Sequence, residues 1–138
     1  MVESVNDEGL VEVGLGDPFQ AIVEGQDAAL QLGAQGLWMF IANAQVRDMD
    51  VGTGARRAAV DFTARLNGTT ISIPAGCRDR EFAMSDGQLY MVTPFIVALD
   101  PSFTGQLAGA TVTLTANIRD REGRNAAAES TVVARFPR

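Results

Sequence analysis

The side chains that could do chemistry in this sequence are carboxylates in two short stretches. Asp48 and Asp50 form one Asp-x-Asp pair, and Asp120 and Glu122 form a similar pair later in the chain. Carboxylates gathered at one end of a domain can bind calcium, which takes about six to eight oxygen ligands. Paired carboxylates can also act as general acid and base, as in glycoside hydrolysis. The competing interpretation is that all four are solvated turn residues.

The residue types that are absent restrict the chemistry further. All 11 basic residues are arginines, and the sequence has neither histidine nor lysine. Without histidine there is no Ser-His or Cys-His nucleophile pair and no imidazole ligand for zinc or copper. Without lysine there is no Schiff base and no phosphate-binding loop of the usual kind. We therefore expect a non-catalytic protein that has no cofactor.

The cysteine content allows no disulfide within the chain, because Cys77 is the single cysteine. Arg78 and Arg80 lie close to it in sequence and could favour the thiolate, but no general base accompanies them. We expect Cys77 to have a structural or incidental role.

The charge of the chain bears on its partners and its location. A formal net charge of −6 disfavours nucleic acid and anionic membranes, because both need clustered cations. No stretch reaches the ~20 apolar residues of a transmembrane helix. The acidic N-terminus lacks the basic and apolar regions of a secretory signal. Either the protein is cytoplasmic, or a signal or lipid anchor upstream of residue 1 has been removed.

The stretch from 33 to 47 organises the chain, because it is the most continuous apolar segment and holds the only tryptophan. Its period of two predicts a central β-strand. The core face of that strand comprises Trp38, Phe40, Ala42, Ala44 and Val46. The opposite face starts with Leu37, Met39 and Ile41 and becomes polar by Arg47.

Further alternating segments predict an all-β protein. They occupy residues 10–15, 19–23, 28–32, 58–66, 69–73, 111–119 and 131–136, and residues 89–99 form a further segment that is apolar on both faces. Asn67-Gly68 predicts a type I′ hairpin, and Pro94 implies an edge strand, a bulge or two short strands. We expect a two-sheet antiparallel sandwich of about seven to nine strands, with a small barrel as the alternative. Residues 1–9 are expected to be flexible, and 10–138 to form a single domain.

Two groups on the central strand are candidates for interaction or packing. Leu37, Met39 and Ile41 form an apolar patch suited to a partner or a second copy if the sheet face is uncovered. The alternative is that the polar connection 75–88 covers them. Trp38 is expected to fill the core between the sheets rather than to stack on a ligand.

The last third of the chain supports a resemblance. Residues 107–136 alternate Val, Leu and Thr up to an Asp-x-x-Gly turn and a final strand. This pattern resembles the last hairpin of bacterial extracellular immunoglobulin-like domains. Together with the turn at 33–38, the chain is similar to single-domain surface or periplasmic lipoproteins of myxobacteria-like organisms. It departs from them at Leu37, where glycine is usual, and at Met39, where histidine often stands, so no metal role is carried over from that histidine.

The resemblance and the missing catalytic side chains imply a non-catalytic module at the cell surface, in the periplasm or secreted. Such a module would bind a protein partner or self-associate through a sheet face or an edge strand. The alternative is a small-ligand or carbohydrate-binding accessory domain, with or without calcium. That alternative predicts a concave site near Asp48 and Asp50, with an exposed aromatic residue such as Tyr90.

Overall fold

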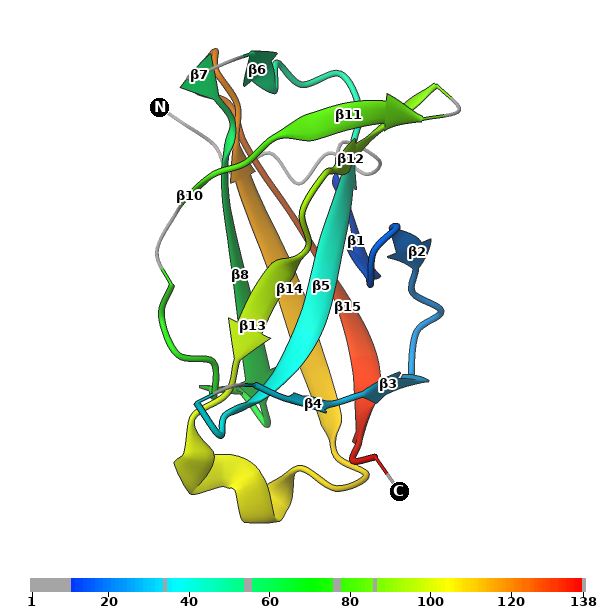
Figure 1. Ribbon diagram of the computed structural model, residues 1–138, viewed down its shortest axis with the longest axis vertical. Coiled ribbons are helices and arrows are strands. Elements are labelled where there is room, and N and C mark those ends of the chain that lie inside the picture. The colour runs from blue at the N-terminus through cyan, green and yellow to red at the C-terminus, as the bar shows by residue number, and fades with distance from the viewer. Residues whose placement is uncertain (1–10, 34, 54–55, 76–77, 86, 138) are drawn as a thin grey trace.

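The computed structural model describes residues 11–33, 35–53, 56–75, 78–85 and 87–137. The expected flexible segment 1–9 and Cys77 lie outside these residues. The described chain forms β-strands and one short 3₁₀ helix, η1 (Pro101–Gln106). The strands make two sheets that pack face to face and a small two-stranded ribbon (Figure 1). The predicted all-β, two-sheet sandwich is therefore confirmed.

The first sheet, which we call the β5 sheet, is built around β5 (Trp38–Val46). One edge of β5 pairs with β1 (Val11–Leu15). The other edge pairs first with β12 (Gln88–Met91) and then with β13 (Phe95–Ala98). Of the arrangements expected around Pro94, the structure thus has two short strands. The other members are β2 (Gln20–Ala21), β4 (Gln31–Leu32) and β11 (Phe82–Ser85).

The second sheet, which we call the β14 sheet, places β14 (Thr111–Arg119) between two long partners. They are β8 (Ala59–Leu66) and β15 (Asn125–Arg135). Short strands complete the sheet and the ribbon: β3 (Gln26–Ala29), β9 (Thr69–Thr70) and β10 (Arg78–Asp79) in the sheet, and β6 (Gly52–Thr53) with β7 (Arg56–Arg57) in the ribbon. All pairings are antiparallel except that of β3 with β15. These two- to four-residue strands are why the described strands outnumber the seven to nine expected.

The Asn67-Gly68 turn joins β8 to β9, with positive φ at both residues as a type I′ turn requires. The returning strand is shorter than the segment expected over 69–73. Beyond β9, Ser72 forms a bridge with Leu99, and the Ile73 backbone N–H donates to the carbonyl oxygen of Ala98 at 2.8 Å. The chain therefore crosses from the β14 sheet to the β5 sheet within a few residues of the hairpin.

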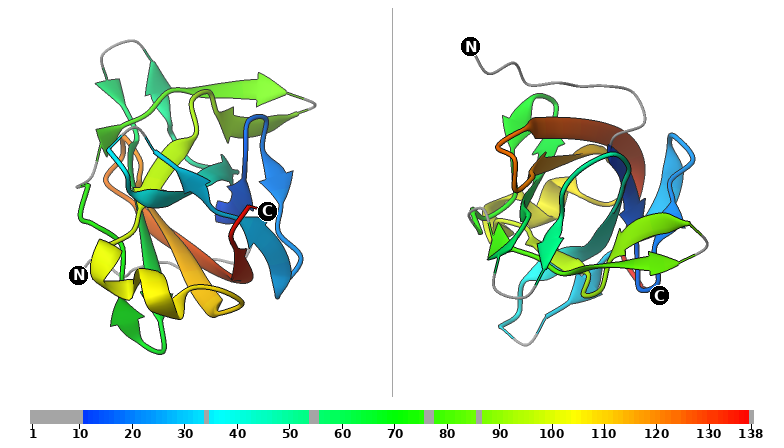
Figure 2. Two further views of the ribbon diagram at one scale, coloured as in Figure 1. Left: turned by 60° about the horizontal axis from the view of Figure 1, so that its bottom comes forward. Right: turned by 90° about the horizontal axis from the view of Figure 1, so that it is seen from above.

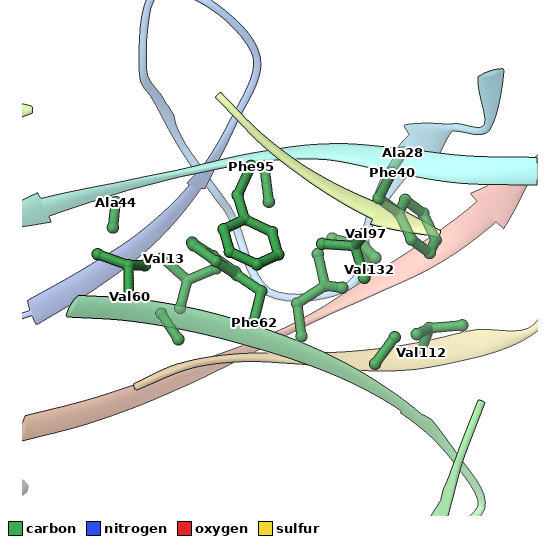
Figure 3. Packing of buried hydrophobic residues seen from close by; sticks show 14 of the residues in the cluster. Val13, Ala28, Phe40, Ala44, Val60, Phe62, Phe95, Val97, Val112 and Val132 are labelled. Atoms are coloured by element: carbon green, nitrogen blue, oxygen red, sulfur yellow. The ribbon is translucent and has the colours of Figure 1, made fainter. Parts of the chain in front are cut away.

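The core lies between the two sheets, where alternate residues of the long strands point inward (Figure 3). Phe62 of β8 meets Phe95 of β13 with ring centroids 5.0 Å apart, so this aromatic pair joins the sheets. Phe40 on β5 is fully buried in the same core. Trp38 is only half-buried and packs edge-on against Phe136 at 4.8 Å. The middle of the core is thus filled by phenylalanines, whereas Trp38 closes one margin.

Replacing Phe62 by alanine tests the aromatic contact between the sheets. Because Phe62 is buried, Phe62→Ala is expected to lower the free energy of unfolding by about 3–5 kcal/mol. The matched control is Thr63→Ala, on the opposite face of the same strand, with an expected loss below about 1 kcal/mol. Urea denaturation of both variants measures the difference. Equal losses would contradict the packing described here.

Candidate functional site

The four carboxylates singled out in the sequence come from two loops that the fold brings together. Asp120, at the end of β14, is buried, and its Oδ1 accepts from the backbone N–H groups of Glu122 and Arg124 at 3.0 and 2.8 Å. Its Oδ2 accepts from Arg124 Nε at 3.0 Å and from the Asp50 backbone N–H at 3.3 Å. Asp120 therefore shapes the β14–β15 turn and ties it to the loop after β5.

The loop after β5 makes its own hydrogen bonds. Asp48 has a φ of 53°, and its carbonyl oxygen accepts from Arg124 Nη2. Asp50 Oδ1 accepts from the Gly52 backbone N–H at 3.0 Å. Glu122 is exposed, and its Oε2 lies 3.9 Å from Arg124 Nη2. The side chains of Asp50 and Asp120 thus both act as acceptors within the turns.

This set of acceptors bears on the calcium hypothesis. Within the described ranges, no three or more His, Cys, Asp or Glu side chains gather in a way that could hold a metal ion. Burial by itself raises the pKa of Asp120. The hydrogen bonds from the Arg124 and Asp50 backbone and the charge of the Arg124 guanidinium outweigh burial, so the pKa of Asp120 lies below its usual value. Its carboxylate is therefore held in the charged form that the turn needs.

The patch residues Leu37, Met39 and Ile41 are half-buried, and Met39 and Ile41 lie on the outer face of β5. A side chain at Gly33 would meet the Met39 methyl group, which shows that the turn before β5 packs on Met39. The connection 75–88 is not a polar loop over this patch. It contains β10, which pairs with β8, and β11, which pairs with β12 toward the opposite end of β5 from Met39 (Figure 1).

Ile96 on β13 extends the patch across the sheet. It stands directly opposite Ile41 in the β5–β13 ladder, and 44% of it is exposed. Val92, in the break between β12 and β13, is 42% exposed. The outer face of the β5 sheet thus carries an apolar stripe, which we define as Met39, Ile41, Ile96 and Val92.

A turn between β1 and β2 folds over the same outer face. Gly14 leaves room for it, because a Cβ there would lie 2.2 Å from the Phe19 ring. The Gly16 backbone N–H donates to the carbonyl oxygen of Ile41 at 2.9 Å. Asn43 is buried although it points outward from β5, and its Nδ2 donates to the Gly16 carbonyl oxygen at 3.0 Å. These contacts fix Phe19 over the sheet.

Phe19 and Tyr90 border a hollow of about 440 Å³, which we call the Tyr90 hollow. Their ring centroids are 5.1 Å apart, and the rings are tilted by 41°. The hollow is lined by Asp17, Pro18, Phe19, Ala83, Tyr90, Met91 and Val92. The β1–β2 turn and the β11–β12 hairpin that supply these residues lie on the same side of the molecule (Figure 2). Of the described residues that line it, Asp17 is the only charged one, and its carboxylate makes no hydrogen bond or ion pair with another described residue.

A smaller, polar hollow of about 290 Å³ adjoins the first one. It is lined by Glu12, Gln45, Arg47 and Gln88. Gln45 is the ladder partner of both Glu12 and Tyr90, so one row of residues across the sheet connects the two hollows. Gln45 Nε2 also donates to Gln88 Oε1. The outer face therefore offers an aromatic hollow and an amide-lined hollow side by side.

Tyr90, the aromatic residue expected to be exposed, is half-buried and lines a concave site, and Asp48 and Asp50 are not among the described residues that line it. The carboxylate present there is Asp17. Sequence reasoning missed both Asp17 and Phe19 as site residues. The signal for them was the Asp17-Pro18 turn next to Gly14, whose missing side chain marks a close approach.

The outer face of the β14 sheet has a different chemistry. Its exposed and half-buried positions are polar over the middle of the strands: Thr63, Arg65, Thr113, Thr115 and Glu129. Arg65 Nη2 lies 2.8 Å from Glu129 Oε2. One outer face of the sandwich is therefore polar and internally paired, while the other carries the apolar stripe.

Comparisons with known proteins add no identification. A scan against protein-family models and a search of curated proteins both give no match for this chain. Among the described residues, the structure has no helix of the length and hydropathy that crossing a membrane requires.

Replacing Asp120 by asparagine tests the turn network. Asp120→Asn is expected to lower the free energy of unfolding at pH 7 by about 1–3 kcal/mol, because the N–H donors around this buried side chain lose a charged acceptor. The folded-state pKa is lowered, so the stabilisation is present above the unfolded pKa near 3.8 and is lost as pH falls through the folded value.

The difference between wild type and Asp120→Asn should therefore shrink as the pH falls below about 4. The control is Glu122→Gln, which removes an exposed carboxylate from the same turn and should change stability little. Urea denaturation from pH 7 to pH 2.5 measures both variants. A difference that stays constant over this range would contradict the role given to the Asp120 charge.

Proposed function

We propose that this chain is a non-catalytic binding module that engages a protein partner through the outer face of the β5 sheet. The observation that carries the proposal is the contrast between the two outer faces. The apolar stripe includes Ile96 and Val92, which are 44% and 42% exposed, whereas the β14 face is polar and ion-paired. Exposed apolar surface next to a hollow is typical of interaction sites.

The edge of the same sheet supports this reading. Opposite β5, β13 pairs with no further strand among the described residues, although the Ile73 backbone N–H donates to the Ala98 carbonyl oxygen at the end of β13 and Ser72 forms a bridge with Leu99 just beyond it. An extended segment could add to such an edge while its side chains reach Ile96 and Ile41. The proposal therefore covers both a sheet face and the edge next to it.

We further propose that the sandwich is immunoglobulin-like. The chain passes from β5 in one sheet to β8 in the other, and again from β13 to β14, and β14 and β15 form a hairpin beside β8. Sheets arranged as β1-β5-β13 and β8-β14-β15 match the order of strands in immunoglobulin-type sandwiches. Location at a bacterial cell surface, in the periplasm or outside the cell is proposed on the resemblance of the last hairpin.

The absence of catalysis rests on residue types. Histidine and lysine do not occur in the sequence. Asp120, the most buried of the four candidate carboxylates, is occupied by four hydrogen bonds within its own turn network. Both observations support a non-catalytic role, because a histidine-based nucleophile pair cannot form and Asp120 is engaged within its turn.

A second candidate function is a small-ligand or carbohydrate-binding accessory domain. It is favoured by the Tyr90 hollow together with the amide groups of Gln45 and Gln88. An aromatic surface beside planar polar side chains can bind an amphipathic ligand such as a sugar. This version uses no calcium, because the Asp48, Asp50, Asp120 and Glu122 loops lie outside both hollows.

Site-specific photo-crosslinking tests the proposed binding face. A photoreactive amino acid is placed at Ile96 in one variant and at Thr113, on the outer face of the β14 sheet, in the matched control. Irradiation in extracts of the cells of origin is expected to give one discrete adduct from the Ile96 variant and none from the Thr113 variant. An adduct of twice the chain mass would identify the partner as a second copy. Equal labelling from both faces, or none from Ile96, would overturn the proposal.

A further inference from the structure

We infer that the Tyr90 hollow receives a cationic side chain, an arginine carried by the protein partner. This inference rests on the proposed function and names the chemistry of the partner. Among the described residues that line the hollow only Asp17 is charged, and no described residue makes an ion pair or hydrogen bond with its carboxylate. A cation is therefore favoured there, and an anion is disfavoured.

The charge of the whole chain acts in the same direction. A formal net charge of −6 attracts positively charged ligands over distances longer than a contact. The adjoining polar hollow contains one residue of each sign, Glu12 and Arg47, so it does not reverse the negative charge of Asp17. A basic partner would thus be steered toward this face.

The aromatic rings supply a second attraction for a cation. Phe19 and Tyr90 lie 5.1 Å apart and both border the hollow. Cations bind over aromatic faces at about 6 Å or less from the ring centroid. Both rings are held in place before any ligand arrives, Phe19 by its packing on Gly14 and Tyr90 by the ladder to Gln45. Little ordering is then needed when the ligand binds.

The remaining walls favour arginine over a small inorganic cation. Pro18 and Val92 are exposed and offer apolar surface against which an aliphatic stem can pack. A guanidinium group can stack on an aromatic ring and hydrogen-bond a carboxylate through its planar fork, which an ammonium cannot do equally well. Val92 also belongs to the apolar stripe, so the hollow and the proposed binding face are continuous.

Peptide titration followed by amide chemical shifts tests this inference. The probe is a blocked Gly-Arg-Gly tripeptide, and the matched control is the same peptide with citrulline, which keeps the shape and removes the charge. The arginine peptide is expected to shift the amides of Asp17, Phe19 and residues 90–92 in a saturable way. The citrulline peptide should bind about fivefold more weakly, as expected for the loss of a cation–π contact and an exposed ion pair.

Two protein variants assign the effect to the hollow. Asp17→Asn is expected to weaken binding of the arginine peptide by about three- to fivefold, which corresponds to one exposed ion pair. Asp61→Asn, on β8 in the opposite sheet, removes the same charge elsewhere and should leave the affinity unchanged. The spread of amide shifts confirms that each variant is folded.

The inference is overturned if both peptides bind equally, if Asp17→Asn has no effect, or if the shifts map to other residues. Saturation of the hollow by maltotriose without any effect of the arginine peptide would overturn it in favour of a sugar ligand. Crosslinking from Ile96 separates this failure from failure of the proposed function. If the crosslinker at Ile96 captures a partner equally well with and without Asp17→Asn, the proposed binding face stands and the inference of a bound arginine is wrong. If the hollow binds the arginine peptide but Ile96 gives no crosslink, the proposed binding face is wrong while the hollow still binds arginine.

Discussion

Strand β5 is paired along both edges, and this constraint determines what each of its faces can do. Its ladders with β1 on one side and with β12 and β13 on the other hold it in the centre of its sheet. The inner face then packs Phe40 and its neighbours into the core. On the outer face Ile96 is 44% exposed, and of the described residues the β1–β2 turn covers the part near Asn43. The hollow and the apolar stripe follow from this partial cover.

Much of the fold could be predicted because it depends on local alternation. The segments around Phe62 and Leu114 alternate cleanly, and they form the inward faces of β8 and β14. Asn67-Gly68 specified its turn because both residues need positive φ. The position of Trp38 within the core was harder to predict from the sequence. Whether a large apolar residue fills the centre or the margin of a core depends on which strands face it, and here three phenylalanines occupy the centre.

The site was harder to predict because its contacts join segments that are far apart in sequence. Tyr90 was singled out as an exposed aromatic, but its partners Asp17 and Phe19 come from the β1–β2 turn. Ile41 was placed correctly on an outer face, yet its neighbour Ile96 depends on the register between β5 and β13. Strand register between distant segments is set by tertiary packing and turn geometry, which one sequence does not state. The Asp120 network was hard to predict for the same reason, because Arg124 links two loops that are far apart in the sequence.

The central claim is that the outer face of the β5 sheet binds a protein partner and that the opposite face does not. The most direct measurement is the loss of amide signal intensity in the isotope-labelled chain when an unlabelled extract of the cells of origin is added. We expect the earliest losses along β5, β12 and β13, where the apolar stripe and the Tyr90 hollow lie. Losses concentrated on the outward residues of β8 and β14, or spread evenly over both sheets, would contradict it.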